Sequence, residues 1–124
     1  MCQFANMSIF NYIDPTIKKF AINLNARVTI DRPSYPKELA TFEERRIDWI
    51  HNYKNKAIII QPTFEVDGIN KNLWNITAIY WFYDSITGER ISDYIDVISK
   101  KEFTSIENNI DELLNQSILF LNQY

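Results

Sequence analysis

Apolar side chains recur at alternate positions through three segments of the carboxy-terminal half of the chain, residues 57–66, 73–83 and 90–98. A period of two is typical of a β-strand, because successive side chains point to opposite faces of a sheet. We therefore predict a strand over each segment. A shorter run over residues 26–31 predicts a fourth strand, which would give a sheet of three to four strands.

The first of these segments contains a proline. Pro62 has no backbone N–H to donate to a neighbouring strand, so we expect residues 57–66 to form an edge strand or to contain a bulge. Residues 67–70, with the sequence Asp-Gly-Ile-Asn, predict the turn that follows. The face predicted to point inward carries Ile58, Ile60, Phe64 and Val66.

Residues 73–83 form the longest predicted strand, and both of its faces are apolar. Such a strand is normally central in a sheet and covered on each side. Trp81 and Tyr83 lie on one face beside Ile79. They belong to the core if helices cover both faces, and to a pocket or an interface if helices cover only one. The other face, predicted to point inward, carries Trp74, Ile76, Ala78, Tyr80 and Phe82.

Residues 84–89, between the last two predicted strands, contain the pair Thr-Gly and predict a hairpin loop. On the returning strand, Asp93 lies on the same side as Ile91 and Ile95. We therefore expect Asp93 to point toward the covered face of the sheet. Asp96 has the opposite parity and is expected to point away.

An amphipathic helix is predicted over residues 100–121, after the last strand. Ser99 and Glu102 have the spacing of a capping box, in which each side chain accepts a hydrogen bond from a free N–H at the helix start. Thr104 and Glu107 repeat this spacing about one turn later. The apolar stripe that would pack on the sheet consists of Phe103, Ile106, Ile110, Leu113, Leu114, Ser117, Ile118 and Leu121.

Two helices are predicted in the amino-terminal half. Asp14, as an N-cap followed by a proline, predicts the first from residue 16 to about residue 23. Residues 36–53 follow a helical period and predict the second. Arg46 interrupts the apolar stripe of that second helix, so residues 45–50 could pair as a strand instead. The stripe of the first helix consists of Ile17, Phe20, Ala21 and Leu24.

These elements predict an α+β fold, in which an antiparallel β-meander is packed by the C-terminal helix and one or two N-terminal helices. A chain of 124 residues matches a single domain, and it contains neither a linker nor an internal repeat. Residues 1–6 are predicted to be a disordered extension of that domain.

Composition narrows the classes of function. The net charge of −3 and the pI of about 5.1 argue against general binding to nucleic acid, which requires a basic surface. No apolar stretch approaches the roughly 18 residues of a membrane-spanning helix. The first residues lack the features of a signal peptide, and the lone Cys2 cannot form an internal disulfide. We expect a cytoplasmic protein that binds neither nucleic acid nor membranes.

The chain has few side chains suited to catalysis. His51 is its only histidine, and on a helix over residues 36–53 it would share a face with Glu44 and Asp48. Such a face could hold a divalent metal, but a zinc site usually has further histidine or cysteine ligands. The acids around the last hairpin have no glycine-rich phosphate loop beside them. We therefore predict no catalytic residue, no metal site and no cofactor.

Two groups of side chains are candidates for contact with a partner protein. Residues 102–124 contain four acids and no lysine or arginine. An acidic surface suits a partner with a basic surface, although acids early in a helix also stabilise its dipole. Trp and Tyr bury large areas at interfaces and keep a polar tip. The predicted contact residues are Glu107, Asp111, Glu112, Trp81, Tyr83, Asp84 and Glu89.

The predicted function is that of a small acidic protein-binding module, an immunity-type or inhibitor protein that neutralises a toxin or enzyme by surface complementarity. In outline, the aromatic meander closed by a helix resembles the immunity proteins of contact-dependent toxin systems, without a shared motif. Two alternatives stay open: a small ligand-binding or hydrolytic domain with a pocket between sheet and helix, and a secretion-type chaperone. The sequence also leaves self-association open.

Overall fold

The computed structural model describes residues 8–31, 43–66 and 68–124. They form one antiparallel sheet of five strands whose order follows the sequence, which confirms the predicted α+β meander. The extension predicted over residues 1–6 lies outside the described residues. The strands are β1 (Arg27–Asp31), β2 (Glu44–His51), β3 (Lys54–Glu65), β4 (Gly68–Tyr83) and β5 (Arg90–Lys101); the helices are the 3₁₀ helix η2 (Ile9–Tyr12), α1 (Asp14–Leu24), α2 (Phe103–Glu107) and α3 (Ile110–Leu121).

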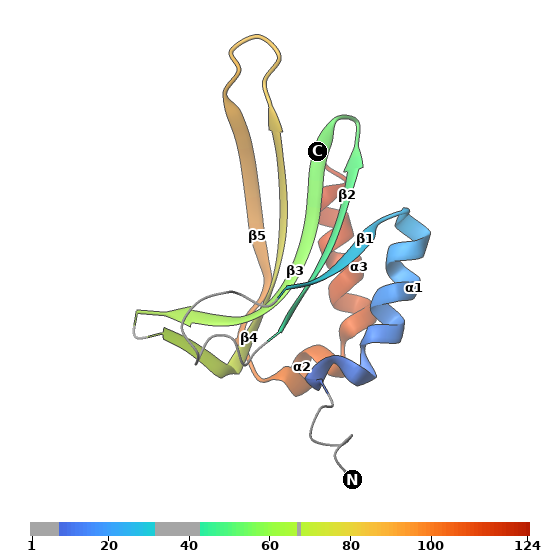
Figure 1. The fold of residues 1–124 in the computed structure, drawn as a ribbon, viewed down its shortest axis with the longest axis vertical. Helices are drawn as coiled ribbons and strands as arrows, with labels where there is room; N and C mark the ends of the chain where they lie inside the picture. Colours follow the sequence, from blue (N-terminus) through green and yellow to red (C-terminus); the bar gives the residue numbers. More distant parts are fainter. Residues whose placement is uncertain (1–7, 32–42, 67) are drawn as a thin grey trace.

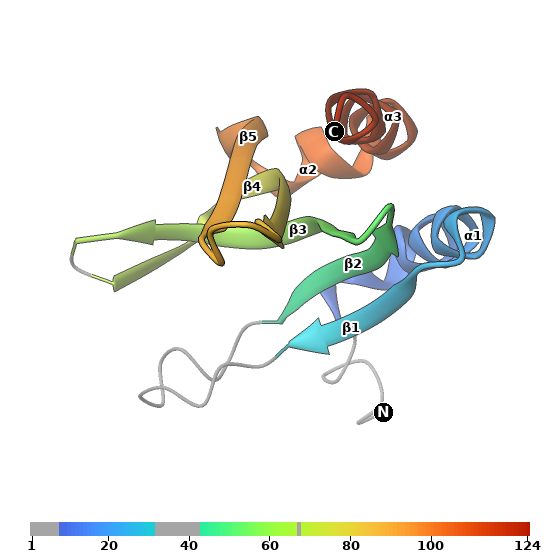
Figure 2. The same cartoon turned by 90° about the horizontal axis from the view of Figure 1, so that it is seen from above.

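The described helices lie on one side of the sheet (Figures 1 and 2). Helix α3 packs on strands β3, β4 and β5, and α1 packs on β1 and β2. No helix of the described part covers the opposite side (Figure 2). The β4–β5 hairpin extends beyond the ends of the other strands (Figure 1).

The core lies between the helices and the sheet, and it contains the residues that the strand and helix periods predict. The inward face of β4 is buried from Trp74 to Tyr80, and Phe82 at its end is partly buried. The predicted stripe of the last helix is also buried, apart from a partly exposed Ile118. Rings of Phe10, Trp74 and Phe103 meet edge to face at centroid distances of 5.0 to 5.6 Å. These rings join η2 and α2 to the sheet.

Residues 44–51 form strand β2, not part of the helix predicted over residues 36–53. β2 pairs with β1 on one side and with β3 on the other, so both neighbours satisfy its backbone groups. Arg45 and Ile47 are buried, whereas the residues that flank them are only partly buried. The strand considered over residues 45–50 is therefore confirmed. The helical prediction was wrong because it treated Arg45 as a surface residue, whereas Arg45 points into the core.

This strand also separates the three side chains considered for a metal. Glu44 and Asp48 lie on the side of the sheet away from the helices, whereas His51 has the opposite parity and lies exposed at the end of β2. The face they would have shared on a helix does not exist. Residues 36–42 of the predicted helix lie outside the described residues.

Strand β3 lies in the middle of the sheet and accommodates its proline through an irregularity in pairing. The register with β4 shifts between Pro62 and Thr63, which confirms the predicted bulge. β3 as a whole lies between β2 and β4, although its pairing with β2 ends at Ile60, before the proline. Beyond the shift the two faces exchange. Thr63 is buried, whereas Phe64, predicted to point inward, is 51% exposed, and Val66 is exposed as well.

The turn between β3 and β4 is shorter than the one predicted over residues 67–70. Gly68 already pairs with Glu65 and begins β4, so Ile69 and Asn70 belong to the strand. Gly68 has a φ angle of 134°, which residues with a side chain rarely adopt.

Strand β5 pairs with β4 at the outer edge of the sheet. Asp93 lies opposite the buried Tyr80 and therefore faces the side of the helices, as predicted. Burial, followed by the charges of Tyr124 and Asp93, raises the pKa of Tyr80 above its ordinary value. Asp96 lies on the other side, where it accepts a hydrogen bond of 2.9 Å from the Thr77 hydroxyl.

The helix predicted over residues 100–121 consists of two helices, α2 and α3, with a break between them. β5 continues to Lys101, so Ser99 belongs to a strand and cannot form the predicted capping box with Glu102. Glu102 is the N-cap of α2, but its side chain makes no capping hydrogen bond. The second candidate capping box, Thr104 with Glu107, lies inside α2. The prediction failed because β5 still pairs with β4 at Lys101, across a bulge in which Lys100 has a φ angle of 53°.

A buried lysine closes the C-terminal end of α3. Lys56 points from β3 toward the helices, and its Nζ donates to the carbonyl oxygens of Leu121 and Tyr124 at 2.8 and 3.0 Å. The last carbonyls of a helix have no partner within it, and a cation there also matches the helix dipole. Burial, followed by the charge of Lys54, lowers the pKa of Lys56. Tyr124 then stacks on Tyr80 at a centroid distance of 4.1 Å.

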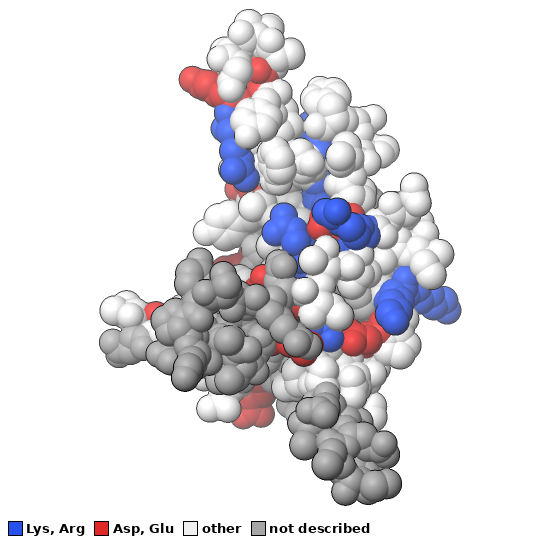
Figure 3. Space-filling view, in the orientation of Figure 1, with Lys and Arg blue, Asp and Glu red and all other residues white. Residues whose placement is uncertain are grey.

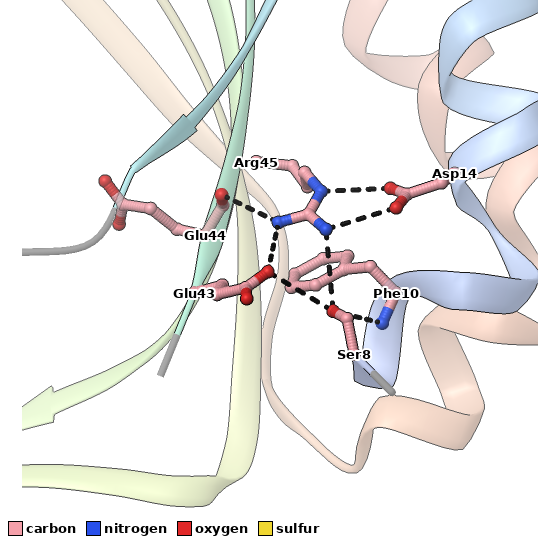
Figure 4. A network of polar contacts seen from close by, with 6 residues as sticks. All are labelled: Ser8, Phe10, Asp14, Glu43, Glu44 and Arg45. Carbon is pink, nitrogen blue, oxygen red and sulfur yellow. Dashed lines mark hydrogen bonds and ion pairs between the residues drawn. The ribbon is translucent and has the colours of Figure 1, made fainter. Parts of the chain in front are cut away.

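A buried arginine joins β2 to the amino-terminal helices (Figure 4). Arg45 is only 2% exposed, and its Nε and Nη2 donate to the two carboxylate oxygens of Asp14 at 2.9 and 3.1 Å. Its Nη1 donates to Glu43 at 3.0 Å, and the guanidinium lies 4.2 Å from the centre of the Phe10 ring. Asp14 therefore acts as a partner of Arg45 within the first turn of α1, not as the predicted N-cap, which is Ile13.

The Asp14 and Glu43 carboxylates compensate the burial of this charge. Burial alone would lower the pKa of Arg45, but hydrogen bonds and charges from Asp14 and Glu43 outweigh it and raise the pKa above its ordinary value. Arg45 therefore stays charged, and removal of either side of the pair leaves a poorly hydrated charge behind.

We predict that Arg45→Met lowers the free energy of unfolding by about 2–3 kcal/mol, below the range for a fully buried pair because Asp14 is partly exposed. Urea denaturation of the single variants Arg45→Met and Asp14→Asn and of the double variant measures it. We expect Asp14→Asn to lower the free energy of unfolding by less in the Arg45→Met background than in the wild type. Additive costs would contradict the coupling.

Candidate functional site

The side of the sheet that none of the described helices covers is the most distinctive surface of the molecule, and we call it the open face (Figure 2). The register assigns to it Arg27 and Thr29 of β1, and the odd-numbered residues of β3 as far as Gln61 and of β4 from Asn75 onward. It also contains the even-numbered residues of β2 and of β5 as far as Asp96. Inward neighbours on the same strands are buried, so the alternation of each strand fixes this surface.

Two cross-strand rows build the part of the open face nearest the β2–β3 turn. One row runs Arg27, Asp48, Ala57, Ile79 and Tyr94 across all five strands. The next row runs Ile50, Asn55, Trp81 and Ser92 across four strands. The first row combines charged, apolar and aromatic side chains, and the second combines apolar, polar and aromatic ones, in a layer that no described helix covers.

Several large side chains on this face are open to solvent. Tyr83 is 60% exposed, Tyr94 is 59% exposed and Ile50 is 72% exposed. Trp81 is partly buried. Its ring meets the Tyr83 ring edge to face at a centroid distance of 5.8 Å, and the Arg90 guanidinium lies 4.7 Å from the centre of the Trp81 ring. Tryptophan, tyrosine and arginine are the residues that contribute most to binding at protein interfaces.

Two arginines share one carboxylate beside the aromatic residues. Arg27 Nη2 lies 3.2 Å from one oxygen of Asp48, and Arg46 Nε lies 3.4 Å from the other. Figure 3 shows basic and acidic atoms close together near the middle of the molecule, among mostly uncharged side chains. Arg27 is largely exposed, so these ion pairs add little to stability. This cluster carries a net positive charge on a chain whose total charge is negative.

A hollow of about 200 Å³ lies between the arginine cluster and Trp81. Its lining includes Arg27, Arg46, Asp48, Ile50, Asn55, Ala57 and Trp81. Pockets for small ligands are commonly larger, about 300–1,000 Å³. Two larger hollows, of about 380 and 340 Å³, lie at Trp74 with Phe103 and between α1 and α3. Neither Asp93 nor His51 lines any of these three hollows of the described part of the chain.

The loop at the tip of the β4–β5 hairpin has a defined shape, as its sequence predicts. The Asp84 carboxylate accepts hydrogen bonds from the N–H groups of Ile86 and Thr87 at 2.8 and 2.9 Å. Gly88, at a φ angle of 72°, donates its N–H to the Asp84 carbonyl. The N–H groups of Thr87 and Ile86 lower the pKa of Asp84. Ile86 is 92% exposed at this tip, next to Glu89, which is also exposed.

The predicted contact residues do not form one surface. Trp81 and Tyr83 lie on the open face, with Asp84 and Glu89 in the loop that follows them. The acidic group Glu107, Asp111 and Glu112 belongs to the helices on the other side of the sheet. Asp111 and Glu112 are exposed in the first turn of α3, where the helix dipole favours acids. Asp111 lines a hollow together with Lys19 of α1.

The sequence prediction missed the arginines and one tyrosine of the open face. Arg27, Arg46, Arg90 and Tyr94 come from three different strands, β1, β2 and β5, and only the pairing register brings them to one side. The sequence signal that could have placed them is the alternation of each strand, because residues next to buried ones point to the opposite face. It would have sufficed for Arg90 and Tyr94 once β4 and β5 were paired.

The described residues contain no group of three or more histidine, cysteine, aspartate or glutamate side chains that could hold a metal ion. Cys2 lies outside the described residues. None of the helices within the described ranges is both long and apolar enough to cross a membrane. Comparison with known protein families, with curated proteins and with solved structures finds no match. The open face therefore has to be interpreted from its own chemistry.

We predict that Asp84→Asn lowers the melting temperature at neutral pH, because the charged carboxylate accepts the two loop N–H groups more strongly than an amide does. The folded-state pKa of Asp84 lies below its unfolded value, so this stability is present above about pH 4 and is lost as the pH falls through the folded pKa. Thermal unfolding of both proteins across this range should show the difference shrinking toward low pH.

Glu89→Gln, which changes the net charge by the same amount in the same loop, controls for overall charge. A difference between wild type and Asp84→Asn that stays constant from neutral to acidic pH would contradict the role of the carboxylate.

Proposed function

We propose that this chain is a small protein-binding module, of the immunity or inhibitor type, that binds its partner through the open face. The observation that carries the proposal is the group of exposed Tyr83, Tyr94 and Ile50 around Trp81, on a sheet face that no helix in the described ranges covers. A monomeric protein rarely exposes so many large side chains on one surface without a binding role.

The composition of this face supports a protein partner over a small substrate. Its aromatic side chains and arginines are spread across four strands, and the hollow among them is small. Broad surfaces with a few aromatic anchors are typical of protein interfaces, whereas ligand sites are usually concave and enclosed. The hydrolytic alternative lacks support among the described residues, because no acids or imidazole meet in a pocket. The cytoplasmic location stays a prediction.

The mode of action that we propose is steric. An inhibitor or immunity protein needs no catalytic group, since it acts by covering a functional surface of its partner. The open face and the shaped loop over residues 84–89 together present such a surface, with the loop projecting beyond the rest of the sheet (Figure 1).

We predict that Tyr83→Ala with Tyr94→Ala weakens partner binding at least tenfold, since each truncation at a binding hot spot costs more than about 1 kcal/mol. Both residues are mostly exposed, so the melting temperature should change little. A pull-down from the native host identifies the partner, and titration with that purified partner measures the affinity.

Tyr12→Ala serves as the matched control, because Tyr12 is an exposed tyrosine on η2, outside the open face. We expect it to bind like the wild type. Equal affinities for the double variant and the wild type would show that the open face is not the contact surface.

The acidic end of the last two helices is the second candidate surface, proposed to meet a basic region of a partner. Asp111→Asn with Glu112→Gln removes two charges without placing cations at the start of α3. If this surface binds, affinity should fall severalfold and the association rate should lose part of its dependence on salt. If affinity and salt dependence stay unchanged, the acidic helix ends are not a contact surface, and only the open face remains as a proposed binding site.

A further inference from the structure

The hollow on the open face has a simple structural origin. Ala57 lies on β3 between Asp48 and Ile79 of the neighbouring strands, and Asn55 lies between Ile50 and Trp81. Small side chains on the central strand, flanked by larger ones on both sides, leave a depression in the sheet surface. Its floor is therefore apolar at Ala57, which the surrounding side chains leave only 2% exposed, with Ile50 and Trp81 as walls and the arginine cluster at the rim.

The walls of the hollow are apolar, whereas its rim carries a positive charge. Arg27 and Arg46 share the single carboxylate of Asp48, so the three groups together carry a positive charge. The guanidinium group suits a carboxylate because its planar N–H donors match the two carboxylate oxygens. An occupant complementary to this hollow combines an apolar side chain with a neighbouring negative charge.

We propose, on the basis of the protein-binding function above, that the hollow receives a continuous acidic segment of the partner protein. An apolar side chain of that segment packs between Ile50 and Trp81, and an aspartate or glutamate next to it pairs with Arg27 or Arg46. The segment would thus bind to a locally positive site on an acidic protein, separate from the acidic end of α3.

A nucleic acid fits this surface less well than an acidic peptide. Exposed aromatic rings and arginines on a sheet can bind single strands, but such sites follow the phosphate chain with a continuous positive groove. Here Glu44, Asp48 and Asp96 lie on the same face as the arginines, so the face lacks the continuous positive groove that a chain of phosphates needs, whereas a single carboxylate needs only one arginine. Arg90 also lies over the Trp81 ring, on which a base would have to stack.

The test uses a phage-displayed library of random peptides selected on the purified chain, followed by affinity measurements on individual synthetic peptides. We expect the selected peptides to carry Asp or Glu next to a large apolar residue. Ala57→Val, which adds two methyl groups inside the hollow, should weaken their binding at least fivefold. Arg46→Gln should weaken it as well and reduce its dependence on salt.

Lys18→Gln is the matched control for Arg46→Gln, because it removes one positive charge from the exposed face of α1. It should bind the peptides like the wild type. Circular dichroism and melting temperature check each fold, and if Ala57→Val is destabilised, Arg46→Gln decides the outcome.

The results separate this inference from the proposed function. Selected peptides without acids that lose binding to the Tyr83→Ala, Tyr94→Ala variant would overturn the acidic segment but leave the open face as a protein-binding surface. Peptides unaffected by any open-face variant, or no specific peptide, would overturn the inference, and the partner pull-down then decides the function independently. Competition by an oligothymidine strand at lower concentration than the peptides would overturn it in favour of nucleic acid.

Discussion

All helices of the described residues cover the same side of the sheet, and this is the constraint on which the rest of the structure depends. A sheet has two faces, and each face that loses contact with water must gain a partner of matching chemistry. The inner face meets this requirement with isoleucines, aromatic rings and the apolar stripes of α2 and α3. The outer face stays hydrated, so it combines arginine, asparagine, threonine and tyrosine with a few apolar side chains. The same alternation that builds the core therefore also creates the surface proposed for binding.

Much of the fold could be predicted because its strands keep a regular period and its final helices keep a regular stripe. The inward residues of β4 and the stripe from Phe103 to Leu121 follow directly from those patterns. The pattern fails where a charged residue points inward. Arg45 is buried with Asp14 and Glu43 around it, and Lys56 is buried against the end of α3. Both look like surface residues in the sequence, because their partners come from distant segments.

The candidate site could be predicted only in part. Trp81 and Tyr83 are recognisable from their place opposite the buried face of one strand. The arginines are not, because Arg27, Arg46 and Arg90 are separated by many residues and share a face only through the register of the strands. The bulge at Pro62 shows the same limitation. The proline predicts an irregularity, but the exchange of faces that exposes Phe64 depends on the register with β4, which the sequence of β3 does not contain.

The projecting β4–β5 hairpin has a consequence for the dynamics of the domain. Residues 90–96 are exposed, and their strand has a neighbour on one side only. Segments with few buried contacts open at a lower free energy than the core, so their amide hydrogens should exchange with solvent sooner than those of β3. A partner seated there would have to order this hairpin as it binds, and part of the interaction energy would be spent on that ordering. Affinity in such a system can change through the stiffness of the hairpin alone, with every contact at the interface kept.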